Sequence, residues 1–194
     1  LTATGATTYT WNNGISNGVA FAPNATNSYI VTGVDGNGCV NQDTVTIVVN
    51  PLPIVSAGAN QTVCLNTPVV LSGSGATTYV WNNSVTNNTP FTPITTNNYI
   101  VTGTDVNGCV NTDTATVTVL PLPNVNAGQD YAICVGLGAT LTGTGASTYQ
   151  WNNNVNNGVT FFPNTTTTYT VIGTGANGCS SQDSVVVTVN TTPT

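Results

Sequence analysis

Residues 99–119 read YIVTGTDVNGCVNTDTATVTV, two runs of alternating side chains on either side of an Asn-Gly pair. In the second run, Ala115, Val117 and Val119 alternate with threonines, which is the two-residue period of a strand with one buried face. The Asn-Gly pair favours a tight hairpin because both residue types accept positive φ angles. The stretch therefore predicts two antiparallel strands joined by a short turn.

A similar stretch recurs along the chain at a period of 70 residues, without insertion or deletion. A fixed period of this length indicates one structural unit copied in tandem. Such copies usually serve length, valency or assembly rather than chemistry. The landmarks that repeat are Trp11, Trp81 and Trp151; Tyr29, Tyr99 and Tyr169; and Cys39, Cys109 and Cys179.

Proline-rich connectors divide the chain into three expected domains. Pro-Leu-Pro stands at 51–53 and again at 121–123. Proline fixes φ and lacks an amide donor, which suits a short, stiff linker. We expect a first domain at 1–51 that lacks its first strand, a complete domain at 52–121, and a complete domain at 122–194 that ends with the start of another linker.

The expected fold class is all-β, a linear array of immunoglobulin-like β-sandwich domains. The second domain shows several short alternating segments and no helical period. Its Tyr79 and Trp81 are two residues apart and share one face, so we expect Trp81 in the core, packed on a disulfide. In the first domain, Val45 should point inward from the last strand. The strands are expected at 61–65, 68–73, 77–82, around Phe91, at 98–105 and near 114–119.

Composition excludes several classes of function. The chain has no Lys, Arg, His, Glu or Met, and six Asp residues give a net charge of −6. Nothing on such a chain neutralises phosphates, so we expect no nucleic-acid binding, and no apolar run is long enough for membrane insertion. Hydroxyl groups have no general base to activate them, so we expect no enzymatic activity and no cofactor. Weak charge also tolerates close self-association.

The five cysteines follow a regular spacing. Cys64 and Cys109 are 45 residues apart, as are Cys134 and Cys179, which predicts two disulfides, one within each complete domain. Cys39 is then an orphan whose partner would precede the first residue given. Free buried thiols and a metal site are the alternatives. Disulfides would place the protein in an oxidising, extracytoplasmic setting and stabilise a small sandwich.

The first domain needs a strand from elsewhere. Either the upstream part of a longer parent chain supplies it, which we favour, or another subunit donates it by β-augmentation.

The landmarks together form the string Cys…Leu…Tyr-x-Trp-Asn-Asn…Phe-x-Pro…Tyr-x-Val-x-Gly-x-Asp-x-Asn-Gly-Cys…Asp-Thr-x-x-Val-x-Val. This string resembles the immunoglobulin-like, PKD-like surface repeats of very large adhesins of gliding bacteria, secreted by the type IX system. The resemblance covers the whole chain and implies a cell-surface or extracellular adhesin or filament without catalysis in the repeats. The third repeat departs from the string, since Gly175 stands where Asp35 and Asp105 stand in the others.

Three kinds of candidate site each have a structural alternative. Asp35 and Asp105 could belong to calcium loops, although hairpin capping suits a single carboxylate per loop better. The tryptophans could stack sugars, although their strand phase favours the core. The resemblance implies O-glycans at Asp-Ser/Thr-aliphatic sequences, where the hydroxyl residues are Thr44, Thr114 and Ser184.

These features predict the structural shaft of an extracellular fibre or cell-surface adhesin built from disulfide-stapled repeats. Its partners would be neighbouring repeats of the same chain, copies of itself in a fibre, and covalent glycans. Two other functions stay open: a self-assembling, pilus-like filament subunit that exchanges strands, and a glycan-binding module.

Overall fold

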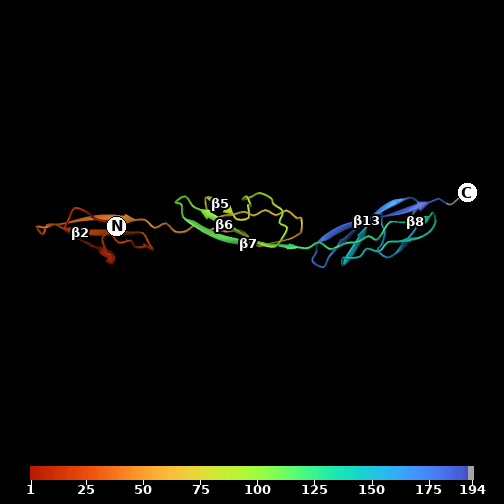
Figure 1. Ribbon diagram of the computed structural model, residues 1–194, viewed down its shortest axis with the longest axis horizontal. Helices are drawn as coiled ribbons and strands as arrows, with labels where there is room; N and C mark the ends of the chain where they lie inside the picture. Colours follow the sequence, from red (N-terminus) through yellow and green to blue (C-terminus); the bar gives the residue numbers. More distant parts are fainter. Residues whose placement is uncertain (192–194) are drawn as a thin grey trace. The chain divides into compact units, whose positions relative to one another are not determined.

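The computed structural model describes residues 1–191. Within them the chain is all-β, apart from one three-residue 3₁₀ turn at Asn12–Gly14. The strands run from β1 to β13 in chain order, and every sheet is built from strands of a single 70-residue repeat (Figure 1). The prediction of an all-β chain of immunoglobulin-like sandwiches is confirmed by the sheet order described below.

The described residues divide into two compact units, and the second repeat contributes to both of them. The domain boundaries at 51/52 and 121/122 stay a prediction based on the repeat and its prolines. The first unit contains 1–56, 74–80 and 102–112, and the second contains 57–73, 81–101 and 113–194.

The third repeat shows the sandwich most fully. Its larger sheet has the order β10-β12-β13-β8, in which β8 runs parallel to β13 and the other pairs are antiparallel. A second sheet pairs β9 with β11. Figure 1 shows these paired strands in the last repeat, β8 in the turquoise and β13 in the blue part of the chain. The strands are β8 Tyr131–Cys134, β9 Ala139–Thr140, β10 Thr148–Trp151, β11 Thr160–Phe161, β12 Thr167–Thr174 and β13 Ser180–Asn190.

One hydrophobic core joins these two sheets. Ala139 on β9, Trp151 on β10, Val171 on β12 and Val187 on β13 are buried in the same cluster, and Phe161 on β11 packs against it. Two sheets that share one core of inward-facing residues form a sandwich. The buried positions alternate along β12 and β13, as the period of the sequence predicts.

The other two repeats keep the order of the larger sheet in whole or in part, with fewer regular strands. The second has a sheet of order β4-β7-β6-β5, in which β4 is parallel to β7, and the first has a sheet of order β1-β2-β3. Their strands are β1 Thr8–Trp11, β2 Asn27–Val34, β3 Val40–Ile47, β4 Gln61–Cys64, β5 Thr78–Trp81, β6 Asn97–Thr104 and β7 Val110–Leu120.

The strands expected at 68–73 and around Phe91 are shorter than predicted. In the second repeat they are reduced to one isolated bridge between Val69 and Phe91. Pro68 and Pro90 precede these residues in the sequence, and a proline cannot donate to a ladder, so long pairing is interrupted there.

The Asn-Gly hairpin has a different geometry from the expected one. Gly108 has a φ of 81°, whereas Asn107 is not among the residues with positive φ. Gly108 donates its N–H to the carbonyl of Asp105 at 3.2 Å, and Asp105 donates to the carbonyl of Cys109 at 3.0 Å. A turn closed in this way and followed by glycine in the left-handed region is the common longer hairpin, which needs only one residue with positive φ.

Val45 is less buried than predicted: it pairs with the buried Tyr29, but 38% of its surface is exposed. The equivalent Val185 in the third repeat is buried in a cluster that includes Ala127. The cluster of the first repeat is built around Trp11, Tyr29 and Val31 and contains no counterpart of Ala127 among the described residues. The inward face of β3 is therefore less covered than that of β13.

Candidate functional site

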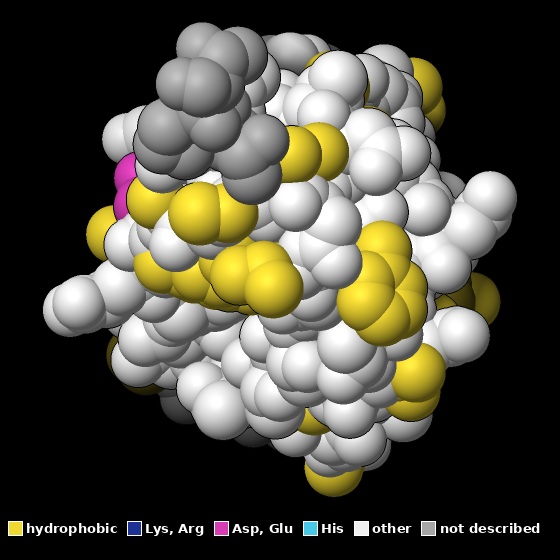
Figure 2. All heavy atoms as spheres, turned by 90° about the vertical axis from the view of Figure 1, so that its right-hand side faces the viewer, with side chains coloured by type: hydrophobic (Ala, Val, Ile, Leu, Met, Phe, Trp, Pro, Cys, Tyr) yellow, Lys and Arg dark blue, Asp and Glu magenta, His cyan; other side chains and the backbone are white. Residues whose placement is uncertain are grey.

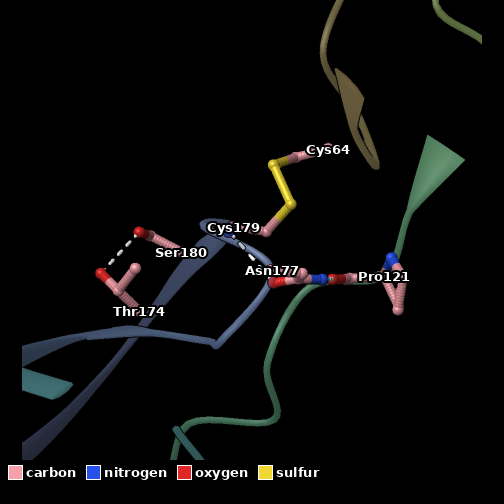
Figure 3. Close-up of a disulfide and its surroundings, with 6 residues drawn as sticks. All are labelled: Cys64, Pro121, Thr174, Asn177, Cys179 and Ser180. Carbon is pink, nitrogen blue, oxygen red and sulfur yellow. Dashed lines mark hydrogen bonds between the residues drawn. A yellow bond between two sulfur atoms is a disulfide. The ribbon is translucent and has the colours of Figure 1, made fainter. Parts of the chain in front are cut away.

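The main candidate for a functional feature is a disulfide that joins the second repeat to the third. Cys64 at the end of β4 is bonded to Cys179, with 5.6 Å between their Cα atoms and 115 residues between them in sequence. Both residues belong to the second compact unit. Figure 3 shows the bond, with Cys179 in the hairpin before β13 and the linker residue Pro121 close by. Cys39, Cys109 and Cys134 are free.

The predicted disulfides within single domains, Cys64–Cys109 and Cys134–Cys179, are therefore wrong. Cys134 is paired in register with Asn190 at the end of β13, whereas Cys179 precedes the first residue of that strand. An 11-residue strand is about 33 Å long, and a disulfide requires Cα atoms within about 7 Å. The two cysteines of one repeat thus lie at opposite ends of a strand and cannot bond to each other.

The tryptophans also do not pack on a disulfide. In the immunoglobulin fold the bond under the core tryptophan joins the second and sixth strands of the sandwich. At the corresponding places of the third repeat, the cluster around Trp151 contains Leu141 and Val171 instead. Aliphatic side chains thus stand where the immunoglobulin disulfide would be. The cysteines of this repeat lie instead near the two ends of β13.

Each tryptophan instead makes a hydrogen bond to an asparagine six residues later. The indole N–H groups of Trp11, Trp81 and Trp151 donate to asparagine Oδ1 at 2.9–3.1 Å. The indoles are only 5–8% exposed, which leaves no ring face on which a sugar could stack. Tyr29, Tyr99 and Tyr169 are buried as well, each 5% exposed, and each ring packs on a phenylalanine ring at 5.0–5.2 Å.

Polar contacts hold the hairpin of the third repeat against its own linker. Asn177 donates its side-chain amide to the carbonyl of Pro121 at 2.9 Å and accepts the N–H of Cys179 at 3.1 Å, as Figure 3 shows. Ser181 donates its hydroxyl to the carbonyl of Pro123 at 2.5 Å. Cys179 is fully buried, so the sulfur is covered where the two repeats meet. We call Cys64, Pro121, Pro123, Asn177, Cys179 and Ser181 the junction.

The departure of the third repeat from the common string lies in this junction. An added Cβ at Gly175 would lie 2.9 Å from Asn177 Oδ1, so the glycine gives the asparagine side chain room to turn toward the linker. In the other repeats the aspartate takes over the capping role. Asp105 accepts the N–H groups of Asn107 and Cys109 at 2.8 Å each, and Asp35 does the same in the first repeat. The carboxylates expected as hairpin caps are hairpin caps.

No cluster of three or more His, Cys, Asp or Glu side chains occurs within residues 1–191. No helix in this range is long and apolar enough to cross a bilayer. The face shown in Figure 2 carries separate hydrophobic patches among other side chains and backbone, with acidic atoms at its left edge.

Two aspartates fix the start of their repeat to its last strand. Asp183 Oδ2 accepts the N–H of Ala127 at 2.8 Å, and Asp113 Oδ2 accepts that of Ala57 at the same distance. These hydrogen bonds, with smaller contributions from the N–H groups of the following residues, lower the pKa of each carboxyl from its ordinary value of 3.8. The following residues Thr114 and Ser184 are exposed, and so is Thr44 in the first repeat. Their hydroxyls can be reached by an enzyme, and their glycosylation stays a prediction.

The first repeat contains an open groove of about 470 Å³. Ala6, Tyr9, Gly33 and Asp43 are among the residues that line it. In the third repeat the equivalent positions are Ala146, Tyr149, Gly173 and Asp183. There, Val125 lies so close to Gly173 that an added Cβ would be 2.4 Å from its Cγ2, and Ala127 is bonded to Asp183. The groove thus has the shape and chemistry that a Val-x-Ala segment occupies in the other repeats.

Comparisons with known proteins found similarity to solved structures alone. No protein-family model matches the chain, and no curated protein matches it significantly. Among solved structures, it is similar to the titin domains I67–I69, with 9% identity, a TM-score of 0.41, and coverage of 85% of this chain and 75% of that one. It is also similar to the eight N-terminal Ig domains of Down Syndrome Cell Adhesion Molecule, with 18% identity, a TM-score of 0.35, and coverage of 94% and 31%.

A bacterial structure is similar to the same extent. This is a Ca²⁺-stabilised adhesin that helps an Antarctic bacterium reach out and bind ice, with 16% identity, a TM-score of 0.34, and coverage of 88% of this chain and 58% of that one. The chain therefore spans about a third of the Down Syndrome Cell Adhesion Molecule fragment and somewhat over half of the adhesin.

Sequence reasoning did not identify the junction, although a signal for it was present. In a tandem repeat, a cysteine can have its partner in its own repeat or in the next one, and the spacing then differs by one period of 70 residues. Cysteines spaced by 45 residues are also spaced by 115 if the partner lies in the next repeat. The direction of β4 and β8, which alternation alone does not give, decides between the two.

Proposed function

We propose that this chain is part of the structural shaft of an extracellular fibre or cell-surface adhesin, of the kind its repeats resemble in gliding bacteria. The observation that carries the proposal is the Cys64–Cys179 bond between successive repeats. A bond inside a domain strengthens that domain alone, whereas a bond between domains also fixes their junction. Such a bond serves a protein that spans distance, and it requires an oxidising environment.

Two further observations support a load-bearing role. The linker carbonyls of Pro121 and Pro123 accept hydrogen bonds from the hairpin of the third repeat. At the linker before the second repeat, Asn111 donates to the carbonyl of Pro53 at 3.0 Å, in the position equivalent to Ser181. The same hairpin-to-linker contact thus recurs at both connectors. A chain without Lys or Arg also offers no site for trypsin-like proteases outside the cell.

Single lysines test the bond between repeats, because the chain has no other tryptic site. Gln129→Lys places a cleavage site between Cys64 and Cys179 but outside both intervals 64–109 and 134–179. Ala59→Lys places the matched site at the equivalent position of the preceding repeat, outside all these intervals. Gln129 and Ala59 are both exposed and lie outside the strands.

The free thiols are first alkylated, and trypsin is then added in urea without reductant. The cut Gln129→Lys chain should keep its full mass until a reductant is added, whereas the cut Ala59→Lys chain should separate at once. Separation of the Gln129→Lys fragments without reductant would show that the bond between repeats does not form, and the proposal would fail.

A second candidate is a self-assembling filament whose subunits exchange strands and so fill the groove of the first repeat. A Val-x-Ala segment from another copy would place valine against Gly33 and offer its alanine N–H to Asp43, as Val125 and Ala127 do with Gly173 and Asp183. Backbone pairing of this type is the usual mode of strand addition.

A peptide with the sequence of residues 121–132 tests this second candidate. Strand exchange predicts that the chain assembles with increasing concentration in sedimentation and that the peptide suppresses assembly. The same peptide with aspartate in place of its valine should have no effect. If the chain stays monomeric at every concentration, the proposal of a self-assembling filament is wrong, and the proposal of a structural shaft is unaffected.

A further inference from the structure

We propose that Cys109 and Cys134 are half-sites of the same junction, so that each repeat is bonded to both of its neighbours. Cys134 would bond the Cys179-type cysteine of a following repeat. Cys109 would bond the Cys64-type cysteine of a preceding repeat. The partner of Cys134 is therefore a further copy of the 70-residue repeat, and the partner of Cys109 is the Cys64-type segment of the repeat before it. This inference rests on the proposed function, because it extends the one observed bond to a tandem array.

The half-site at Cys134 has the same backbone geometry as the bonded half-site at Cys64. Leu65 donates to the carbonyl of Leu120 at 2.9 Å, and Val135 donates to that of Asn190 at 2.9 Å. Cys64 and Cys134 both end a four-residue strand that pairs in parallel with the end of a long strand. Cys134 is exposed, as a site for a further partner requires.

The half-site at Cys109 matches the bonded hairpin of Cys179. Asp105 donates to the carbonyl of Cys109 at 3.0 Å, and Gly175 donates to that of Cys179 at 2.9 Å. The hairpin of Cys109 is also held to its linker, through the bond from Asn111 to Pro53. The hairpin of Cys109 therefore shares its closing bond and one linker contact with the hairpin of Cys179, although Asp105 caps Cys109 where Asn177 caps Cys179.

Bonds of this register would form two interleaved series. Each disulfide encloses 115 residues, which is longer than one 70-residue period, so successive loops overlap. Every linker would then lie inside one such loop, so a single cut in a linker would leave the array covalently connected. An array bonded within domains has no such property, because every linker would be a single covalent path.

The chemistry of bond formation is an ordinary exchange with a small-molecule disulfide such as oxidised glutathione. The thiolate of Cys134 attacks one glutathione sulfur, forms a mixed disulfide and expels one glutathione thiolate. The thiolate of the partner cysteine then attacks the Cys134 sulfur and expels the second glutathione. Two protein thiols lose two electrons, two molecules of reduced glutathione form, and the two protons pass to them.

A chain extended at its beginning tests Cys109. A copy of residues 55–70 placed before Leu1 continues the repeat in register and supplies a Cys64-type cysteine. After refolding with oxidised glutathione, Cys109 should be bonded to this added cysteine, and Cys39 should remain open to alkylation. Peptide mapping after pepsin digestion identifies the partner. A bond from the added cysteine to Cys39, or no bond, would overturn the inference.

A chain extended at its end tests Cys134. A copy of residues 125–194 placed after Thr194 supplies a Cys179-type cysteine, and Cys134 should become resistant to alkylation. The matched control is the same extension with serine in place of its Cys179-type cysteine, in which Cys134 should stay reactive.

The two proposals fail in different ways. If Cys134 stays reactive while Cys64–Cys179 is intact in the same molecule, the inference is wrong and the proposed shaft survives. If Cys64–Cys179 is absent as well, both are wrong. Intact Cys64–Cys179 also shows that the extended chain has folded, so a reactive Cys134 cannot be attributed to misfolding.

Discussion

Asp183 accepts the backbone N–H of Ala127 at 2.8 Å and so ties the first extended segment of the third repeat to its last strand. Asp113 and Ala57 make the same bond one repeat earlier. The alanines are almost fully buried, 3% and 1% exposed, so each bond holds a segment whose side chain is part of the interior. The carboxylates thus tie an inward-facing segment to the last strand in the second and third repeats.

Because these hydrogen bonds lower the pKa of Asp113 and Asp183 below 3.8, they make the stability of the protein depend on pH. A depressed folded-state pKa gives stability that is present above the unfolded value and is lost as pH falls through the folded value. We expect the urea midpoint to be constant from pH 7 to about 5 and to fall below about pH 4. The double variant Asp113→Asn, Asp183→Asn should show a smaller fall. An equal fall in both proteins would contradict the assignment.

Asn157, which accepts the indole N–H of Trp151, should stabilise the fold more than an ordinary exposed asparagine does. Asn157 Oδ1 accepts the N–H of Trp151 at 2.9 Å and that of Gly143 at 2.7 Å. Asn157→Ala leaves both donors without this acceptor, which should cost about 1–3 kcal/mol in the free energy of unfolding. Tryptophan fluorescence in urea measures the loss. The exposed neighbour Asn156 provides the control, and Asn156→Ala should change stability by less than about 0.5 kcal/mol.

Replacing Gly175 in the junction hairpin should break the hydrogen bond from Asn177 to the linker carbonyl of Pro121. In Gly175→Asp, the new carboxylate would cap Cys179 as Asp105 caps Cys109, and would displace Asn177 from Pro121. Loss of one hydrogen bond of about 1 kcal/mol should let dithiothreitol reduce Cys64–Cys179 at about fivefold lower concentration. Alkylation and mass spectrometry measure the reduced fraction. Asp105 is not part of this junction, so Asp105→Gly should leave the dithiothreitol concentration that half-reduces Cys64–Cys179 unchanged.

The exposed hydroxyls after the aspartates lead to a prediction about the protein from its natural source. Thr44, Thr114 and Ser184 are exposed, whereas Thr116 and Thr118 farther along β7 are half-buried. We expect mass spectrometry to find added hexose on Thr44, Thr114 and Ser184. Thr116 and Thr118 should be unmodified. Digestion at aspartate or at aromatic residues is needed, since trypsin has no site. Unmodified masses at all three positions would remove this prediction.

Alternation and turn residues were sufficient to predict most of the fold. The strand prediction at 98–105 differs from β6, Asn97–Thr104, by one residue at each end, and the prediction at 77–82 contains β5. Both strands carry a strict two-residue period, which reports burial directly. The strands expected at 68–73 and near Phe91 failed because prolines interrupt their pairing, and their side chains are buried without long ladders.

The disulfides could not be predicted in the same way. Alternation shows which face of β4 is buried but not whether β4 runs parallel or antiparallel to β7. That direction places Cys64 beside Leu120, at the opposite end of the strand from Cys109. An antiparallel β4 would have brought Cys64 toward Cys109. The error therefore concerns one strand direction, and correcting it changes the bond from a feature of one domain into a feature of the array.

The bond between repeats should be visible as a large change in extensibility. When the chain is pulled from its ends, force passes through Cys64–Cys179 and bypasses the enclosed segment of the chain, a sequence separation of 115 residues. At about 3.5 Å per extended residue, reduction should lengthen the fully unfolded chain by about 400 Å. Single-molecule force spectroscopy with and without dithiothreitol measures this difference. The variant Cys64→Ser, Cys179→Ser should reach the full length without reductant, because its backbone is the only covalent path. If the oxidised protein extended as far as this variant, tension would not pass through the junction, and the bond would have no mechanical role.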